Sequence, residues 1–229
     1  MCGRFSQSSS PQQYAEQFGI STDLSLKARY NVAPTDQVVA CCLSDEGEKI
    51  LTTLHWGLIP SWSKGPDKRF SMINARAETV ASKPAYRGPF RKHRCLIPAD
   101  GFYEWKQEDG KQPYYVHADA NNPLVFAGIW DHWQDESGDR INSCSIIVCD
   151  ANEQMHRLHE RMPVILPADK WDDWLGEKSV DALQEMLVPY KGNDLEIYPV
   201  SRLVNSPTHE GEELIKRLKI PNNLDDRLL

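Results

Sequence analysis

Runs of apolar and β-branched residues recur along the chain, most of them bounded by Gly, Pro or Asp, and such runs predict strands. Two polar segments, 45–48 and 135–139, interrupt the pattern and are typical of hairpin loops. The predicted strands are Val38 to Leu43, Lys49 to His55, Tyr114 to His117, Val125 to Trp133, Cys144 to Asp150, Val164 to Leu166 and Leu195 to Val200.

Helices are fewer and short. Ser10 before Pro11 fits an N-cap and first helical residue, and Gly19 fits the end, so the pattern predicts a helix over 11–18. Further short helices are predicted at 151–158, 167–175, 179–187 and 210–218. We expect one α+β domain over residues 1–229, with a curved, mostly antiparallel, barrel-like β core, peripheral short helices and a frayed tail from about residue 221.

Composition places the chain among ordinary globular proteins. Apolar residues make up 40% and charged residues 26%, and no apolar run approaches the roughly 20 residues that span a bilayer. The first residues have no secretory apolar segment, so we expect a cytoplasmic protein with reduced cysteines and no membrane partner. Five cysteines are expected to be small buried residues in strands: Cys41, Cys42, Cys95, Cys144 and Cys149.

Charge is unevenly distributed along the chain. The formal net charge is −7, yet residues 61–95 carry nine Lys or Arg against Asp67 and Glu78. A basic stretch is either a solvated face or a phosphate-binding surface, and the pattern alone favours neither. Aromatic residues interleave with it. Trp56 is expected in the core, whereas Trp62, in a predicted mobile loop over 63–71, is a candidate for base stacking.

Cys2 is the first candidate nucleophile. Aminopeptidase removal of Met1 before a small residue leaves an α-amine and a β-thiol on the same residue. The amine, with a pKa near 8, can form an imine with an aldehyde, and the thiol can then close a five-membered thiazolidine. The same thiol could instead attack an amide, as in N-terminal nucleophile hydrolases, or Cys2 could simply be a small second residue.

Two further segments place polar groups where chemistry needs them. In Asn74-Ala75-Arg76-Ala77-Glu78 the polar residues alternate with alanines at strand spacing and so point to one face, which is either hydrated or the wall of a site. Glu104 lies between Tyr103 and Trp105, which would raise its pKa into a range useful for proton transfer. The alternative is an exposed Glu on an edge strand.

His156 and His159 are spaced i,i+3 at the end of a predicted short helix. No third ligand stands at a recognisable spacing, so we expect neither a metal there nor any cofactor. His159, beside Arg161, is better suited to acid/base work near neutral pH.

In this order, MCGRF, YNVAP, WGLIPSW, NARAET, CLIPADGFYEW, HERMPVIL and a late PVS span residues 1 to 201. Together they resemble the SOS response-associated peptidase family of abasic-site processing proteins. The resemblance implies a single α+β domain that crosslinks to abasic sites in single-stranded DNA through a thiazolidine and shields the lesion.

Carried onto this chain, the resemblance implies Cys2 as nucleophile, Asn74 as the residue that positions it, and Glu104 and His159 as a proton-transfer pair. It implies DNA contacts for Arg4, Arg76, Arg87, Arg161 and Trp62. It also suggests self-reversal of the crosslink and a lyase side reaction.

The short acidic tail favours a bacterial-type, nucleoid-associated protein, and we expect a monomer. The sequence therefore supports three hypotheses: a covalent abasic-site sensor, an N-terminal-nucleophile peptidase and a non-catalytic single-strand-binding module.

Overall fold

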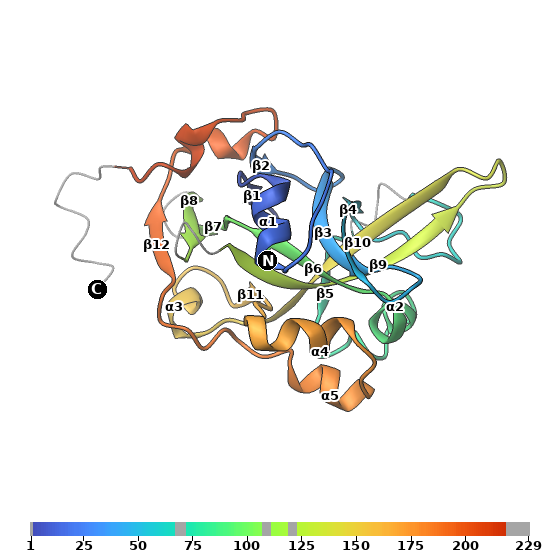
Figure 1. Cartoon of the computed structure of the whole chain (residues 1–229). Coiled ribbons are helices and arrows are strands. Elements are labelled where there is room, and N and C mark those ends of the chain that lie inside the picture. Colours follow the sequence, from blue (N-terminus) through green and yellow to red (C-terminus); the bar gives the residue numbers. More distant parts are fainter. Residues whose placement is uncertain (1, 67–71, 107–110, 119–122, 219–229) are drawn as a thin grey trace.

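The structure is a computed structural model that describes residues 2–66, 72–106, 111–118 and 123–218. The predicted frayed tail and residues 67–71 of the predicted mobile loop lie outside this range. The described residues form an α+β fold in which two β-sheets pack together and short helices cover the periphery (Figure 1). The predicted fold class is confirmed.

The larger sheet closes on itself. Its strands follow one another in the order β10, β4, β3, β6 and β9, and β9 pairs again with β10, so that the ring forms a small barrel. The neighbours are antiparallel except for β10 and β4, which run parallel. The strands are β3 (Gln37–Leu43), β4 (Lys49–Trp56), β6 (Arg94–Ala99), β9 (Leu124–Gln134) and β10 (Arg140–Asp150).

The long strand β10 continues beyond the ring. There it pairs in parallel with β5 (Asn74–Arg76) and antiparallel with β11 (Arg161–Pro163). Asn74 lies opposite Ile146, and Arg161 lies opposite Asp150. Two segments far apart in sequence, the NARAET motif and the HERMPVIL motif, are thus held on either side of one strand.

The smaller sheet has the strand order β12, β8, β7, β1 and β2. β7 lies in its interior, between β8 and β1. Glu104 therefore stands on an interior strand, and the edge-strand alternative for this residue is wrong. The strands are β1 (Phe5–Gln7), β2 (Arg29–Val32), β7 (Gly101–Lys106), β8 (Gln112–His117) and β12 (Glu196–Pro199).

Apolar rings and one buried amide join the two sheets. The Phe5 ring packs edge-on against Trp56 at 4.9 Å and against Phe126 at 6.1 Å between centroids. The Gln7 amide accepts from Val39 N–H at 2.9 Å and donates to Pro98 O at 2.8 Å. Because buried amides are costly unless fully bonded, these contacts fix the position of β1, and with it the N-terminal segment, against the barrel.

Most predicted helices are present but shorter than expected. α1 (Pro11–Gln17) begins at the Ser10 N-cap with a capping box, and Gly19 follows it with φ +69°. The others are α3 (Glu153–His156), η1 (Ala168–Lys170) with α4 (Trp171–Leu175), and α5 (Val180–Glu185). The predicted helix over 210–218 is wrong, since only the 3₁₀ turn η3 (Glu212–Ile215) forms there.

Some elements differ from the sequence pattern. The segment 164–166 is not a strand; β11 lies just before it, and only Ile165 bridges to Phe126. The helix α2 (Arg87–Lys92) and the 3₁₀ turn η2 (Arg202–Asn205) were not predicted. β1, β2, β6 and β7 were likewise absent from the predicted strands.

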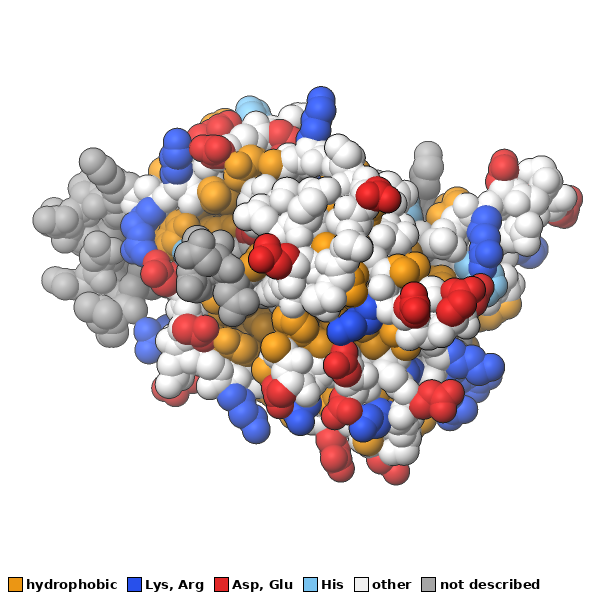
Figure 2. Space-filling view, viewed as in Figure 1, with side chains coloured by type: hydrophobic (Ala, Val, Ile, Leu, Met, Phe, Trp, Pro, Cys, Tyr) orange, Lys and Arg blue, Asp and Glu red, His pale blue; other side chains and the backbone are white. Residues whose placement is uncertain are grey.

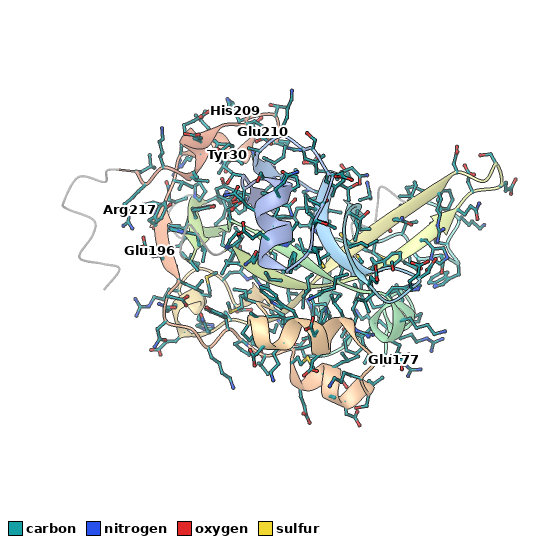
Figure 3. All side chains as sticks on the ribbon, in the orientation of Figure 1. Tyr30, Glu177, Glu196, His209, Glu210 and Arg217 are labelled. Atoms are coloured by element: carbon teal, nitrogen blue, oxygen red, sulfur yellow. The ribbon has the colours of Figure 1, made fainter. Side chains whose placement is uncertain are left out.

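The C-terminal part of the described chain folds back over the smaller sheet, where Tyr30, His209 and Glu210 lie together (Figure 3). Glu210 accepts from Arg29 Nε at 2.7 Å and from Tyr30 N–H at 2.8 Å. Arg217 contacts Glu196 on β12 at 3.4 Å. Of the helices described, none has the length and apolar character needed to span a membrane.

Candidate active site

The N-terminal segment is anchored by one carboxylate. Asp100, in the turn between β6 and β7, accepts from Ser9 N–H at 3.0 Å and from Tyr14 OH at 2.6 Å. The backbone of the segment also pairs with β7, since Tyr103 N–H donates to Arg4 O at 3.0 Å. Cys2 therefore enters the protein along an interior strand and leaves no exposed surface.

The Cys2 thiol is buried and lies near the Glu104 carboxyl group. Burial raises its pKa well above the ordinary value, and the charge of Glu104 raises it further. Its Sγ lies 4.0 Å from Arg4 O. The thiol is therefore protonated at neutral pH, and any attack by sulfur requires a base to take its proton.

Asn74 holds the backbone of Cys2. Its Nδ2 donates to Cys2 O at 2.8 Å, and its own carbonyl oxygen accepts from Tyr86 OH at 3.3 Å. The side-chain oxygen Oδ1 is buried and has no hydrogen-bond partner among the described residues. A buried acceptor without a partner is costly, so Asn74 offers an acceptor for a donor brought by a ligand or by the processed N-terminus.

Glu104 is the buried carboxyl group of the site, with an exposed fraction of 2%. Burial raises its pKa, whereas the positive charge that His159 can carry lowers it. A buried carboxyl group with a raised pKa can both accept and return a proton during a reaction. The rings of Tyr103 and Trp105 pack in a cluster with Tyr115, Val200 and Leu214, and successive side chains of a strand point to opposite faces, so the burial of Glu104 is not due to these two sequence neighbours.

His159 is held in one tautomer by the backbone. Its Nδ1 accepts from Arg161 N–H at 2.9 Å, so the neutral ring carries its proton on Nε2. Nε2–H is then the ring group that can donate a hydrogen bond to a ligand. The Arg161 guanidinium itself pairs with Glu78 and, at 3.3 Å, with Asp150.

Pairwise interactions therefore connect four of the predicted residues: Cys2, Asn74, Glu104 and His159. We call these four residues the capture site. They come from the N-terminus, β5, β7 and the loop before β11. The four residues combine a buried thiol, an amide that holds its backbone, a buried carboxyl and an imidazole with a defined hydrogen-bond donor, and groups of these kinds can serve addition to a carbonyl.

The basic residues predicted to bind DNA differ in how free they are. Arg76 is exposed at the end of β5, next to Asn74 in the strand. Arg4 is half-buried, and its guanidinium donates to Asn31 Oδ1 and to Val204 O, both at 2.8 Å. These two hydrogen bonds hold the Arg4 side chain against the protein, whereas Arg76 lies at the protein surface.

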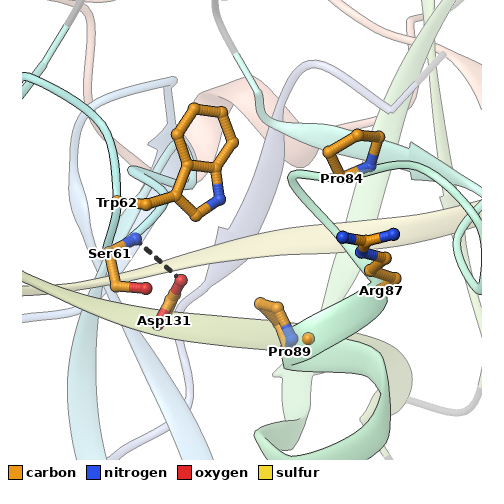
Figure 4. A pocket seen from close by; sticks show the side chains of 7 residues that line it. Ser61, Trp62, Pro84, Arg87, Pro89 and Asp131 are labelled. Carbon is orange, nitrogen blue, oxygen red and sulfur yellow. Dashed lines mark hydrogen bonds between the residues drawn. The ribbon is translucent and has the colours of Figure 1, made fainter.

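Trp62 and Arg87 line one open hollow of about 480 Å³, and Figure 4 shows them on opposite sides of it. Its wall includes Ser61, Pro89 and Asp131, and Ser61 N–H donates to Asp131 Oδ2 at 2.9 Å. The Trp62 side chain is 68% exposed. We call this region the Trp62–Arg87 hollow.

Not all of the basic residues at 61–95 lie at the protein surface. Arg94 is buried and donates to the carbonyls of Trp174 and Phe90 at 2.6 and 2.9 Å and of Gly176 at 2.7 Å. It therefore caps helix ends rather than facing solvent. The face in Figure 2 carries acidic and basic side chains side by side, with no continuous basic surface.

Comparison of the chain with known protein families identifies the family to which it belongs. A family model, "SOS response associated peptidase (SRAP)", matches residues 1–207. The chain belongs to this family. It is 42% identical over 223 residues to "Abasic site processing protein YoqW" of Bacillus subtilis, covering 94% of this chain and 99% of that protein.

Two further similar proteins have lower sequence identity. "Abasic site processing protein YedK" of Escherichia coli is 32% identical over 229 residues, covering 94% of this chain and 99% of that protein. A solved protein structure from Bacteroides thetaiotaomicron has a TM-score of 0.86 and 27% identity, covering 95% of this chain and all of that one. The predicted family is confirmed.

Two residues that support the capture site were not identified as candidates from the sequence. Asp100 anchors the N-terminal segment, and Tyr86 braces Asn74 from a turn before α2. Asp100 stood inside the CLIPADGFYEW motif, but nothing local showed which backbone it would hold. Among the described residues, one group of three candidate metal ligands occurs, and it includes neither His156 nor His159.

Proposed function

We propose that this chain processes abasic sites in single-stranded DNA by capturing the lesion covalently on Cys2. The observation that carries the proposal is the burial of the Cys2 thiol beside Glu104, with the Cys2 carbonyl held by Asn74. The names of the SRAP relatives support abasic DNA as the substrate.

The reaction begins when Met1 is removed and Cys2 gains a free α-amine. An abasic deoxyribose is a cyclic hemiacetal that must open to its aldehyde before it can react. His159 Nε2–H donates a hydrogen bond to the ring oxygen. Glu104 takes the proton of the C1′ hydroxyl and returns it to the ring oxygen as the bond from C1′ to the ring oxygen breaks, so that the ring opens with no net change in protons.

The α-amine then adds to C1′, and the resulting carbinolamine loses water to give an imine. Glu104 carries the protons of this dehydration and then accepts the thiol proton as sulfur bonds to C1′. The former imine nitrogen takes up a proton as the ring closes. One amine, one thiol and one aldehyde give a thiazolidine and one water.

The raised pKa of the thiol favours this order of bond formation. A protonated buried thiol is a poor first nucleophile, whereas an amine of ordinary pKa near 8 has a useful neutral fraction at pH 7. Sulfur attacks second, when the electrophile is already attached to the same residue and the reaction is intramolecular.

The DNA strand would be held by groups around the capture site. We assign phosphate contacts to Arg76, Arg87 and Arg161, and to Arg4 through its backbone-anchored guanidinium, and we assign base stacking to Trp62. Arg161 also positions His159 through its N–H.

The decisive experiment is a denaturing gel of the protein after incubation with an abasic single-stranded oligonucleotide. The wild-type protein should give a crosslink that survives denaturation without borohydride, because a thiazolidine is stable and a bare imine is not. Cys2→Ser keeps the α-amine and should crosslink only after borohydride treatment. An N-terminally extended chain should give neither product.

A wild-type protein that forms no stable crosslink, with loss of Met1 verified by mass spectrometry, would contradict the proposal. The imine intermediate also allows β-elimination of the 3′ phosphate, which we propose as a lyase side reaction. The peptidase alternative ranks second, because the raised thiol pKa disfavours the thiolate that amide attack needs. It predicts self-cleavage of the intact N-terminus in pure protein.

A further inference from the structure

Three potential metal ligands meet around Asp131, which lines the Trp62–Arg87 hollow. His93 follows α2 and precedes β6, while Asp131 and His132 are consecutive on β9. Trp130 N–H donates to His93 O at 2.8 Å, so the backbone fixes the two segments side by side. One ligand atom from each residue lies within 4.8 Å of the other two.

The Asp131 carboxylate is at the centre of this group. Its Oδ1 lies 4.0 Å from His93 Nδ1 and 3.9 Å from His132 Nδ1. Two ligands at bonds of about 2.0–2.1 Å in a tetrahedral site are about 3.4 Å apart, so modest side-chain rotations would bring all three atoms onto one ion. Asp131 itself is buried, with 7% of its side chain exposed.

The surroundings of the three side chains are those of a supported metal site. Asp131 accepts from Ser61 N–H through Oδ2 and from His132 N–H through Oδ1, both at 2.9 Å, which fixes the carboxylate plane. The His93 ring stacks on Trp130 at 4.7 Å. The Nδ1 of His132 is buried and has no hydrogen-bond partner in the part of the chain that the structure describes.

Charge and protonation also bear on this group. The positive charges of Lys92 and Arg140 act on His93, as does the negative charge of Asp131. A neutral imidazole is the form that binds metal. Lys92 and Arg140 repel a cation, and the buried Asp131 carboxylate offsets that repulsion.

We propose that His93, Asp131 and His132 bind a transition metal ion of the Zn²⁺ class. Two imidazoles and one carboxylate suit such an ion better than Mg²⁺ or Ca²⁺, which prefer oxygen ligands. Three protein ligands leave a coordination position for water or another oxygen ligand. Because Asp131 also lines the hollow, the ion would add positive charge beside Arg87. This assignment revises the expectation of no metal and does not depend on the chemistry at Cys2.

Calorimetric titration of tag-free protein with Zn²⁺ tests the assignment. The free amine and thiol of Cys2 can themselves chelate Zn²⁺, so the titration is made in a Cys2→Ala background as well as in the wild type. The Cys2→Ala protein should bind one Zn²⁺, and adding His132→Gln or His93→Gln should weaken binding at least about tenfold. His209→Gln, which changes an exposed histidine outside the group, should leave it unchanged.

His132→Gln is the decisive variant, because 41% of that side chain is exposed and its loss should leave the fold intact. Thermal unfolding without metal checks this directly, and Zn²⁺ should raise the unfolding temperature of Cys2→Ala but not of the double variant. Absence of Zn²⁺ binding by Cys2→Ala, or equal binding after His132→Gln, would overturn the assignment. Asp131 would then serve only to hold the backbone of Ser61.

Discussion

The capture site and the Trp62–Arg87 hollow differ in how far their side chains are buried and in how many separate segments of the chain build them. Cys2 and Glu104 are almost entirely buried, whereas 68% of the Trp62 side chain is exposed. The capture site is assembled from four separate segments, each fixed by a strand or by a backbone hydrogen bond. The hollow is built mainly from the start of α2 and the loop at Ser61.

This difference separates chemistry from binding. Bond formation needs side chains whose pKa values differ from those of the same groups in water. Burial provides this difference by raising the pKa values of Cys2 and Glu104. Strand binding needs exposed rings and charges that tolerate many sequences. We therefore expect substitutions in the first region to change the rate of capture and those in the second to change affinity.

Glu104→Gln should give the largest effect. Loss of a positioned proton carrier costs about 10²–10⁴ in rate, so capture at saturating DNA should slow by that factor while non-covalent affinity changes little. The measurement is single-turnover crosslink formation on denaturing gels. Glu177→Gln, which changes an exposed residue in the loop between α4 and α5, is the matched control (Figure 3). An unchanged rate in Glu104→Gln would show that Glu104 is only a buried structural residue.

Trp62→Ala tests the hollow in the opposite sense. Stacking of a base on an aromatic ring contributes about 1–3 kcal/mol, so affinity for abasic single-stranded DNA should fall by that amount. The rate at saturation should stay near that of the wild type, because Trp62 is not part of the capture site. Trp62→Phe should retain most of the affinity. If Trp62→Ala slowed saturated capture as strongly as Glu104→Gln, the division between the two regions would be wrong.

The buried carboxyl also predicts a trade between activity and stability. Burial raises the pKa of Glu104 in the folded state above its unfolded value. The folded protein then binds its proton more tightly, so the contribution of Glu104 to stability falls as pH rises from the unfolded pKa through the folded pKa. Glu104→Gln should unfold at a higher temperature than the wild type at pH 7, and its advantage should shrink toward pH 4.

Thermal unfolding of both proteins across this pH range measures the difference. Glu177→Gln, with an exposed carboxyl, should run parallel to the wild type. A Glu104→Gln protein that is less stable than the wild type at pH 7 would mean that the ionised carboxylate is held by favourable contacts that exceed the cost of its burial.

Much of the capture site could be predicted because the motifs carry it in order. MCGRF, NARAET, CLIPADGFYEW and HERMPVIL each contributed one residue, and the structure brings Cys2, Asn74, Glu104 and His159 into one connected set. The strand alternation in NARAET also correctly left Ala75 and Ala77 buried. Local pattern sufficed there because the side chain's face follows directly from strand period.

The remainder depended on contacts between distant segments. Nothing in the local sequence shows that β10 runs parallel to β4 and so closes the barrel, or that Arg94 turns inward to helix carbonyls while Arg87 faces the hollow. α2 was missed because Gly88 and Pro89 disfavour a helix locally, yet packing of the buried Phe90 stabilises it. Charge counting treated these arginines as equivalent, and only burial distinguishes them.

The smallest effect we predict concerns Arg87. Each phosphate contact on a single strand contributes about 0.7 to the slope of log affinity against log salt, so Arg87→Ala should reduce that slope by about this amount. The loss should be similar for abasic and intact strands, because a phosphate contact carries no information about the base. The control is Arg91→Ala, which removes an arginine from the last turn of α2, the helix that begins at Arg87. Arg94 is buried and is therefore not suitable as a control. Equal slopes for Arg87→Ala and wild type would mean that the hollow binds bases without the adjacent phosphate, and that the strand is held mainly around the capture site.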